Sequence, residues 1–328
     1  MKRQDHPIYS TKMKGLALQK FIGVDFGVPR RAGDQARKTI LIEAVKRAPN
    51  RYEIPPSGRN ERLVRPIGND WLSRRRGWVI NELRDSLVAD RAVDAAAFDF
   101  PFSIPVELLN DLRFAHRVGR ATPFVTRAAW QSWVAENMPL SFDGDKATSR
   151  LVGLELFDVW RDHDFWVSRV TDKATKASPP LKDKFQAVFN MTIAGAALLK
   201  ALAENGYQEK LIEVEQGRAV METYPRAVAA RLGFTGSYKQ QPLACLETAI
   251  EGLAGRGIQL EIDPDVKNFC QTYTTGDQDH DGVDAFLCLV TAICFDQGQA
   301  EMCGEVVKEE GAIIVPKPLK ACVLIPEP

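Results

Sequence analysis

The run Phe21-Ile22-Gly23-Val24-Asp25 decides the fold, because it predicts a short buried strand that ends on a carboxylate. A charge at the end of an apolar strand is costly to bury unless cations or hydrogen-bond donors surround it. Gly23 and Gly27 leave little side-chain bulk near Asp25, which suits the close approach of a metal ion or a phosphate. The alternative is an aspartate that only forms a turn.

The segments that follow Asp25 predict a mixed sheet. Lys38–Val45 is rich in β-branched residues, and Arg51–Ile54 reads as a third strand. Their close spacing favours antiparallel hairpins. Apolar residues at helical spacing predict a helix over Asp70–Ala89, which would place the next strand, Val93–Asp99, parallel to a neighbour. The predicted order is therefore β-β-β-α-β.

Further carboxylates occupy comparable positions. Asp99 ends its strand just before Pro101, and Asp281 and Asp284 lie three residues apart at the start of a helix predicted to end near Phe295. Acids in a first helical turn often only satisfy the exposed amides and the helix dipole. Clustered acids repel one another unless cations bind between them, so the whole set predicts a divalent-metal site made of Asp25, Asp99, Asp281 and Asp284.

Two other residues are candidates for the same site. Glu222 ends the predicted strand Arg218–Thr223, where it would either complete the metal site or pair with Arg226 one turn later. His280 precedes the late helix and would relay protons or orient a water, unless it is an ordinary surface histidine.

Basic and aromatic residues suggest where a substrate would bind. Arg74, Arg75 and Arg76 belong to a locally basic segment that could track a phosphate backbone, although such a run is usually a solvated helix face. Four tryptophans could stack on bases, but their helical spacing favours a place in the core: Trp130, Trp133, Trp160 and Trp166.

Composition sets limits on the partners. Lys plus Arg and Asp plus Glu both number 43, so no overall basic field indicates nucleic acid. No apolar run approaches the ~20 residues of a membrane helix, and the N-terminus lacks an apolar signal stretch. The six cysteines have no Cys-x-x-Cys spacing. We therefore expect a cytoplasmic protein with no membrane partner; a homo-oligomer is compatible with the sequence.

The chain resembles the RNase H-like superfamily. Gly23-Val24-Asp25-Phe26-Gly27 is similar to the first strand of the RuvC-type branch, and Asp281-Gly282-Val283-Asp284-Ala285 is similar to its terminal helix. More narrowly, the chain resembles the domain-of-unknown-function 429 family of predicted nucleases. That match rests on the segments 99–103, 169–172, 222–225, 281–285 and 310–316. RuvC-type enzymes usually carry Glu where this chain has Asp99, and the shorter side chain would change the metal spacing.

The resemblance implies an α/β fold with a mixed five-stranded RNase H-like sheet in the order β-β-β-α-β-α-β-α. The expected organisation is a polar tail (1–20), a first part of the core (21–102), a large helical insertion (103–210) and a second part of the core (211–328).

The implied activity is a nuclease with two Mg²⁺ or Mn²⁺ ions that hydrolyses phosphodiester bonds in DNA or RNA. Asp25, Asp99, Asp281, Asp284, Glu222 and His280 would be catalytic, and Arg169 would join Arg74–Arg76 in binding the substrate. Two alternatives remain: a non-catalytic nucleic-acid-binding or scaffold protein with the same fold, and an actin-like phosphotransferase, which Asp25-Phe26-Gly27 also resembles but which needs a second glycine-rich phosphate loop.

Overall fold

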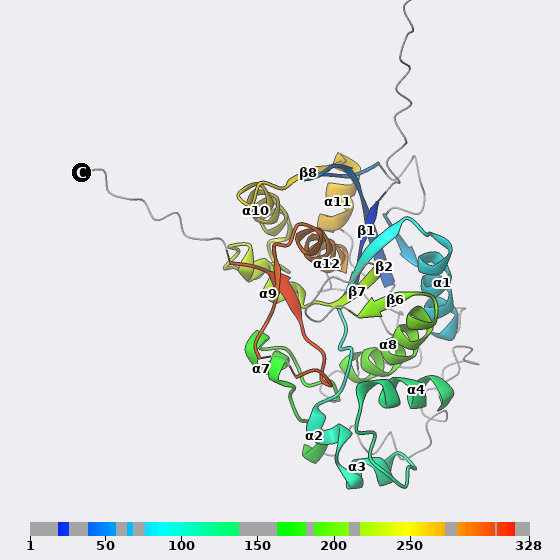
Figure 1. Ribbon diagram of the computed structural model, residues 1–328. Helices are drawn as coiled ribbons and strands as arrows, with labels where there is room; N and C mark the ends of the chain where they lie inside the picture. The colour runs from blue at the N-terminus through cyan, green and yellow to red at the C-terminus, as the bar shows by residue number, and fades with distance from the viewer. Residues whose placement is uncertain are drawn as a thin grey trace, which may run out of the picture.

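The computed structural model describes residues 19–25, 39–56, 64–67, 76–137, 163–181, 187–209, 217–272, 281–305 and 307–318. Within these residues the chain forms an α/β structure around one large mixed sheet (Figure 1). Seven strands follow the order β6-β7-β5-β1-β2-β3-β8, and β4 pairs with β2. The strands are β1 (Lys20–Asp25), β2 (Thr39–Ala48), β3 (Arg51–Ile54), β4 (Val64–Ile67), β5 (Val93–Phe98), β6 (Tyr207–Glu209), β7 (Arg218–Glu222) and β8 (Gln259–Ile262).

The direction of each strand follows from its connection. β1 pairs antiparallel with β2 and β2 with β3, as predicted, and only residues 49 and 50 separate β2 from β3. β5, which follows α1, runs parallel to β1, and β7 runs parallel to β5. The carboxyl ends of β1, β5 and β7 therefore meet at one edge of the sheet, where ligands commonly bind in α/β proteins.

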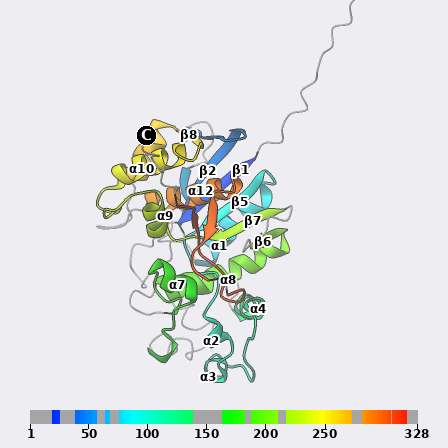
Figure 2. The same ribbon diagram turned by 60° about the vertical axis from the view of Figure 1, so that its left-hand side comes forward.

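Helices cover both faces of this sheet (Figures 1 and 2). One face packs against α9, α10, α11 and α12, and the other against α1 and α8. The helices among the described residues are α1 (Arg76–Ala89), α2 (Val106–Leu109), α3 (Leu112–Arg117), α4 (Arg127–Asn137), α7 (Val170–Thr175), α8 (Ala187–Glu204), α9 (Pro225–Arg231), α10 (Pro242–Ala254), α11 (Pro264–Thr272) and α12 (Asp281–Asp296), with a short 3₁₀ helix at His163–Phe165.

Helix α12 is the centre of the first face. Every residue from Asp281 to Cys294 is buried, so this helix has no solvent face over that length. It lies directly on β1, because Gly23 offers no side chain: a Cβ there would stand 2.1 Å from the Leu289 amide nitrogen and 2.2 Å from the Ala285 carbonyl oxygen. The prediction that Gly23 makes room for a metal or phosphate is therefore wrong, because the space beside it is filled by the helix backbone.

A smaller core lies beyond the second face of the sheet. Phe114, Phe124 and Trp130 pack there between α2, α3, α4 and α8, with Trp133 stacked on Trp130 at 5.8 Å between ring centroids. The core position expected for these two tryptophans is confirmed. Helix α8 also contributes to the layer on the sheet, and β6, close to the end of the predicted 103–210 insertion, joins the sheet beside β7.

The segment before the last strand ties this part to the sheet. The Glu310 carboxylate accepts hydrogen bonds from the amides of Val106 and Val170, which begin α2 and α7. The neighbouring Glu309 carboxylate accepts from the Arg127 amide, which begins α4. Helix starts leave amides without partners, so two adjacent glutamates cap three helices at once.

Strands β1, β2, β3, β5 and β7 and helix α12 lie within a few residues of where the sequence predicts them. The mixed α/β sheet is present, although it has eight strands rather than five. The last strand, β10 (Ile314–Pro316), pairs with β9 (Ala300–Met302) in a separate small sheet. The five described cysteines are buried and unpaired, in line with the absence of a disulfide pattern.

Candidate metal centre

Asp25 and Asp99, at the carboxyl ends of the parallel strands β1 and β5, point to the same face of the sheet. Gly23 of β1 and Ala97 of β5 face α12, so Asp25 and Asp99, two residues further on, face α12 as well. The Asp99 amide donates to the Val24 carbonyl at 3.0 Å, which continues the pairing of β1 and β5 past Phe98 and keeps the two aspartates adjacent.

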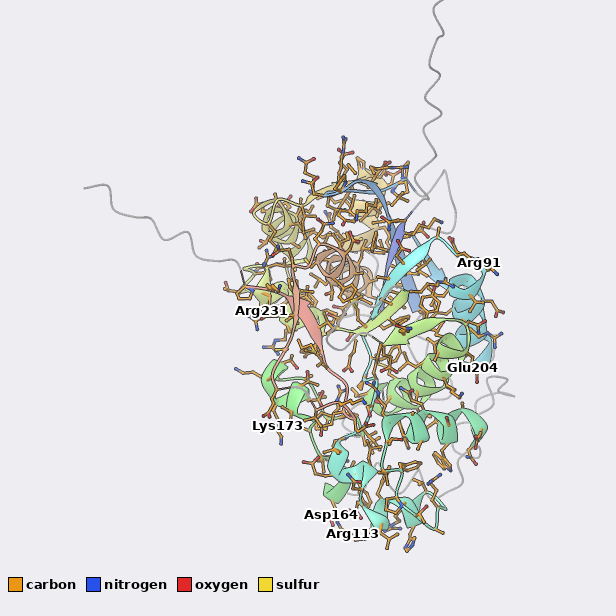
Figure 3. All side chains as sticks on the ribbon, in the orientation of Figure 1. Arg91, Arg113, Asp164, Lys173, Glu204 and Arg231 are labelled. Atoms are coloured by element: carbon orange, nitrogen blue, oxygen red, sulfur yellow. The ribbon has the colours of Figure 1, made fainter. Side chains whose placement is uncertain are left out.

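Helix α12 brings a third carboxylate to this edge. Asp25, Asp99 and Asp284 each offer an oxygen, and these oxygens lie within 4.8 Å of one another. Asp25 and Asp284 are 8% and 4% exposed, and Asp99 is partly exposed. In contrast, charged side chains such as Arg113, Lys173 and Glu204 extend from the outer surface of the molecule (Figure 3). Residues separated by about 260 positions in the sequence thus converge on one buried acidic centre.

The electrostatics of this centre are unfavourable without a cation. Burial raises the pKa of Asp25 well above its usual value, and the charges of Asp281, Asp284 and Asp99 raise it further. Asp281 is buried in the first turn of α12, as predicted, but it is not part of the group of three. The charge on Asp25 therefore requires compensation that its protein neighbours only partly supply.

Lys239 is a basic residue that faces the centre. Its Nζ lies 3.2 Å from Oδ2 of Asp284. Burial alone would lower the pKa of Lys239, but the charges of Asp284 and Asp25 outweigh burial and raise it. The neighbouring Tyr238 is buried beside the acids, and both burial and the charge of Asp284 raise the pKa of its hydroxyl.

A cavity of about 200 Å³ opens over the three aspartates. One side of it is charged and includes Lys239, whereas Phe100, Val188 and Met191 form an apolar wall. An occupant with an anionic group beside Lys239 and an apolar part against this wall would fit such a lining.

Glu222 is not one of the three carboxylates whose oxygens meet at the centre, although it lines the same cavity. On β7, Thr223 lies level with Asp25 and Asp99 and contacts Thr291 of α12. Glu222 comes one residue earlier, so its side chain points away from α12. The Glu222 carboxylate instead pairs with Arg169 at 2.8 and 2.5 Å and accepts from the Phe102 amide. It makes this pair rather than one with the exposed Arg226.

Arg169 is fully buried, and all five of its N–H donors are occupied. They reach Glu222, both oxygens of Asp172 and the carbonyl of Glu310. Burial alone would lower the pKa of Arg169, but the charges of Glu222 and Asp172 raise it overall. The prediction that Arg169 binds substrate is therefore corrected: its guanidinium lines the cavity but joins α7 to β7.

The remaining predicted residues are not described. Arg74, Arg75 and His280 lie outside the described residues, and for Arg76 only the backbone at the start of α1 is described. Sequence reasoning also missed Lys239 and Tyr238, which lie in a turn between α9 and α10 that carries no motif. Thr223 is predictable, because side chains alternate along a strand and Met221, two residues earlier, belongs to the core on the α12 face.

The residues present fit a divalent cation. Carboxylate oxygens are the ligands that Mg²⁺, Mn²⁺ and Ca²⁺ prefer. Oδ1 of Asp284 is buried and has no hydrogen-bond partner, a costly state that an ion would relieve. Asp25, Asp99 and Asp284 could therefore hold a metal ion.

Comparisons with known proteins identify no relative: no family model, curated protein or solved structure matches the chain. None of the described helices is long and apolar enough to cross a membrane.

Proposed function

We propose that this protein is a metal-dependent hydrolase of phosphodiester bonds with an RNase H-like fold, acting on nucleic acid. The single observation that carries the proposal is the group of three carboxylates, within 4.8 Å of one another, at the carboxyl ends of β1 and β5 and the start of α12. These are the positions that the RNase H-like resemblance assigns to metal ligands.

The arrangement of the sheet supports the same fold. Three antiparallel strands are followed by a helix and by strands parallel to β1, which matches the predicted order apart from the added β4, β6 and β8. The five segments on which the narrower resemblance rests also meet around the centre: Asp99 and Asp284 are in it, Arg169 and Glu222 line the cavity, and Glu310 holds α7 beside it.

Each residue has a defined part in this proposal. Asp25, Asp99 and Asp284 hold the cation, which would be Mg²⁺ or Mn²⁺. When bound, such ions activate a water and stabilise the leaving oxygen of an in-line displacement. Phe100, Val188 and Met191 would contact the apolar parts of a nucleotide, while the acids and Lys239 define the position of its phosphate.

Cleavage assays test this function. Labelled single-stranded DNA, duplex DNA and RNA are incubated with the full chain in Mn²⁺, in Mg²⁺ or in EDTA. We expect metal-dependent cleavage that falls at least about 100-fold in Asp25→Asn, since even residues that only orient metal ligands contribute 10–100-fold. Asp265→Asn, which alters an exposed aspartate in the first turn of α11, is the matched control and should keep wild-type activity.

Two results would contradict the proposal. Cleavage by Asp25→Asn at the wild-type rate would separate the activity from this centre. Calorimetry without Mg²⁺ or Mn²⁺ binding at millimolar concentration would instead favour a non-catalytic binding or scaffold protein.

A further inference from the structure

Asp284 uses its two oxygens differently, and this difference bears on how many ions the centre takes. Oδ2 lies 3.2 Å from the Lys239 ammonium. Oδ1 is buried without a hydrogen-bond partner, in a residue that is only 4% exposed. One oxygen of Asp284 is therefore available to an ion, and the other already contacts a positive charge.

The spacing of the three carboxylates matches the surroundings of one ion. Oxygen ligands lie ~2.0–2.6 Å from Mg²⁺, Mn²⁺ or Ca²⁺, so ligands on opposite sides of one ion are up to about 5 Å apart. The 4.8 Å limit on the Asp25, Asp99 and Asp284 oxygens falls within that span. Asp284 could bridge to a second ion about 4 Å from the first only by giving up Lys239, because its second oxygen contacts that ammonium.

Lys239 is held in this position by its turn. The amides of Gln240 and Gln241 both donate to the Ser237 carbonyl, which closes the turn before α10. Tyr238 is buried beside the acids, and the Lys239 ammonium lies 5.8 Å from the centre of its ring. The Lys239 side chain remains 43% exposed, so its ammonium can also contact an anion that enters the cavity.

One divalent ion and Lys239 together can balance the three carboxylates of the centre. Asp25, Asp99 and Asp284 carry three negative charges when ionised, and Lys239 with one divalent ion supplies three positive charges. Asp281 adds a fourth negative charge at the first residue of α12, where the helix dipole already favours it.

We propose that Lys239 stands in for a second metal ion: the centre binds one divalent cation, and the Lys239 ammonium neutralises Asp284 and contacts an anionic oxygen of the substrate. The inference rests on the proposed function and replaces the two ions that the resemblance implies with one ion and one lysine.

Mn²⁺ titration of the full chain tests this proposal, with free Mn²⁺ followed by electron paramagnetic resonance and with heats measured by calorimetry. We expect one Mn²⁺ per chain in the wild type. In Lys239→Met, the first Mn²⁺ should bind at least about tenfold more tightly, because a competing positive charge is removed, and a second Mn²⁺ should bind at millimolar concentration. Lys239→Arg keeps the charge and should bind one ion.

The matched control is Lys267→Met, which removes a lysine that pairs with Glu247 between α10 and α11. It should behave as the wild type does. Lys239 is partly exposed, so Lys239→Met should fold, and circular dichroism checks this.

The outcomes separate the inference from the proposed function. Two Mn²⁺ ions in the wild type, or unchanged binding in Lys239→Met, would overturn the role of Lys239 and leave metal-dependent hydrolysis standing. One Mn²⁺ in the wild type with the expected change in Lys239→Met, but no cleavage of any phosphodiester, would support the lysine and refute the function. A wild type that binds no Mn²⁺ would refute both.

Discussion

Asp25 carries a charge that the folded chain supports poorly without a cation. Its carboxylate is buried at the end of β1, and Asp281, Asp284 and Asp99 add repulsion. Replacing it with Asn keeps the shape and removes the charge. In EDTA near neutral pH, Asp25→Asn should therefore unfold at a higher urea concentration than the wild type. Its free energy of unfolding should be larger by about 1–3 kcal/mol, the usual cost of an uncompensated buried polar group.

The pH dependence of this difference has a defined sign. Because the pKa of Asp25 is raised in the folded state, the protonated form contributes stability that is fully present below its unfolded pKa, about 3.8, and is lost as the pH rises through the folded pKa. The stability gain of Asp25→Asn should be near zero at about pH 4 and should grow as the pH rises. A gain that is constant with pH, or equally large in Asp265→Asn, would argue against a strained charge at Asp25.

Arg169 is a structural residue whose loss should be costly. Removing it leaves the Asp172 and Glu222 carboxylates buried without their partner. We expect Arg169→Met to lower the free energy of unfolding by about 3–5 kcal/mol in urea titrations. Arg226→Met, on the exposed side of α9, is the control and should change stability by less than about 0.5 kcal/mol.

The double variant Arg169→Met/Glu222→Gln distinguishes a buried ion pair from simple loss of packing. Neutralising Glu222 should recover part of the stability lost in Arg169→Met. If the two changes add without any recovery, the pairing described for Arg169 is not the source of its effect.

Single residues show where sequence reasoning works and where it fails at this scale. Asp25, Asp99 and Asp284 could be predicted, because a charge beside an apolar strand or at a helix start is visible in the sequence. Glu222 points away from α12, because side chains alternate along a strand and the next residue, Thr223, is the one that faces this helix. Lys239 and the partner of Arg169 come from segments with no pattern, so only the folded chain reveals them.

The contact between α12 and β1 sets the depth of the centre. At Gly23 the helix backbone lies where a side chain would be, so this glycine lets α12 approach and bring Asp284 to Asp25. Gly23→Ala should push α12 away and destabilise the fold by about 3 kcal/mol, the upper end of the usual cost of overpacking. It should also weaken Mn²⁺ binding, because the three carboxylates would separate.

Gly236→Ala provides the control for this change. A Cβ at Gly236 would meet only side-chain atoms of Phe234 and Gln241, at 3.1 and 3.3 Å, and these can move aside. It should lower the urea midpoint only slightly. Gly23→Ala with wild-type stability and wild-type Mn²⁺ affinity would show that the helix tolerates displacement and does not set the geometry of the centre.

Elements are predicted well by periodicity, whereas their mutual placement is not. β1, β5, β7 and α12 all lie where apolar patterns place them. Nothing in the sequence states that α12 would be buried all round, or that the role of Gly23 is to contact a helix rather than a ligand. These properties depend on which helix covers which face, and that is decided by packing over the whole chain.

At the scale of the molecule, one edge of the sheet collects segments from the whole sequence. β1 supplies Asp25, the end of β5 supplies Asp99, and α12 supplies Asp284. Glu309 and Glu310 cap α2, α4 and α7 and so hold the smaller helical core beside the same edge. The parallel direction of β1, β5 and β7 explains this convergence, because their carboxyl ends must lie together.

The most direct measurement is a crystal of the full chain soaked in Mn²⁺ and recorded at the manganese absorption edge. We predict an anomalous peak with oxygens of Asp25, Asp99 and Asp284 at ~2.0–2.5 Å, and no such peak in Asp25→Asn crystals grown the same way. Ordered aspartates with no peak between them, or manganese bound only at other carboxylates, would contradict the assignment of this centre to a metal.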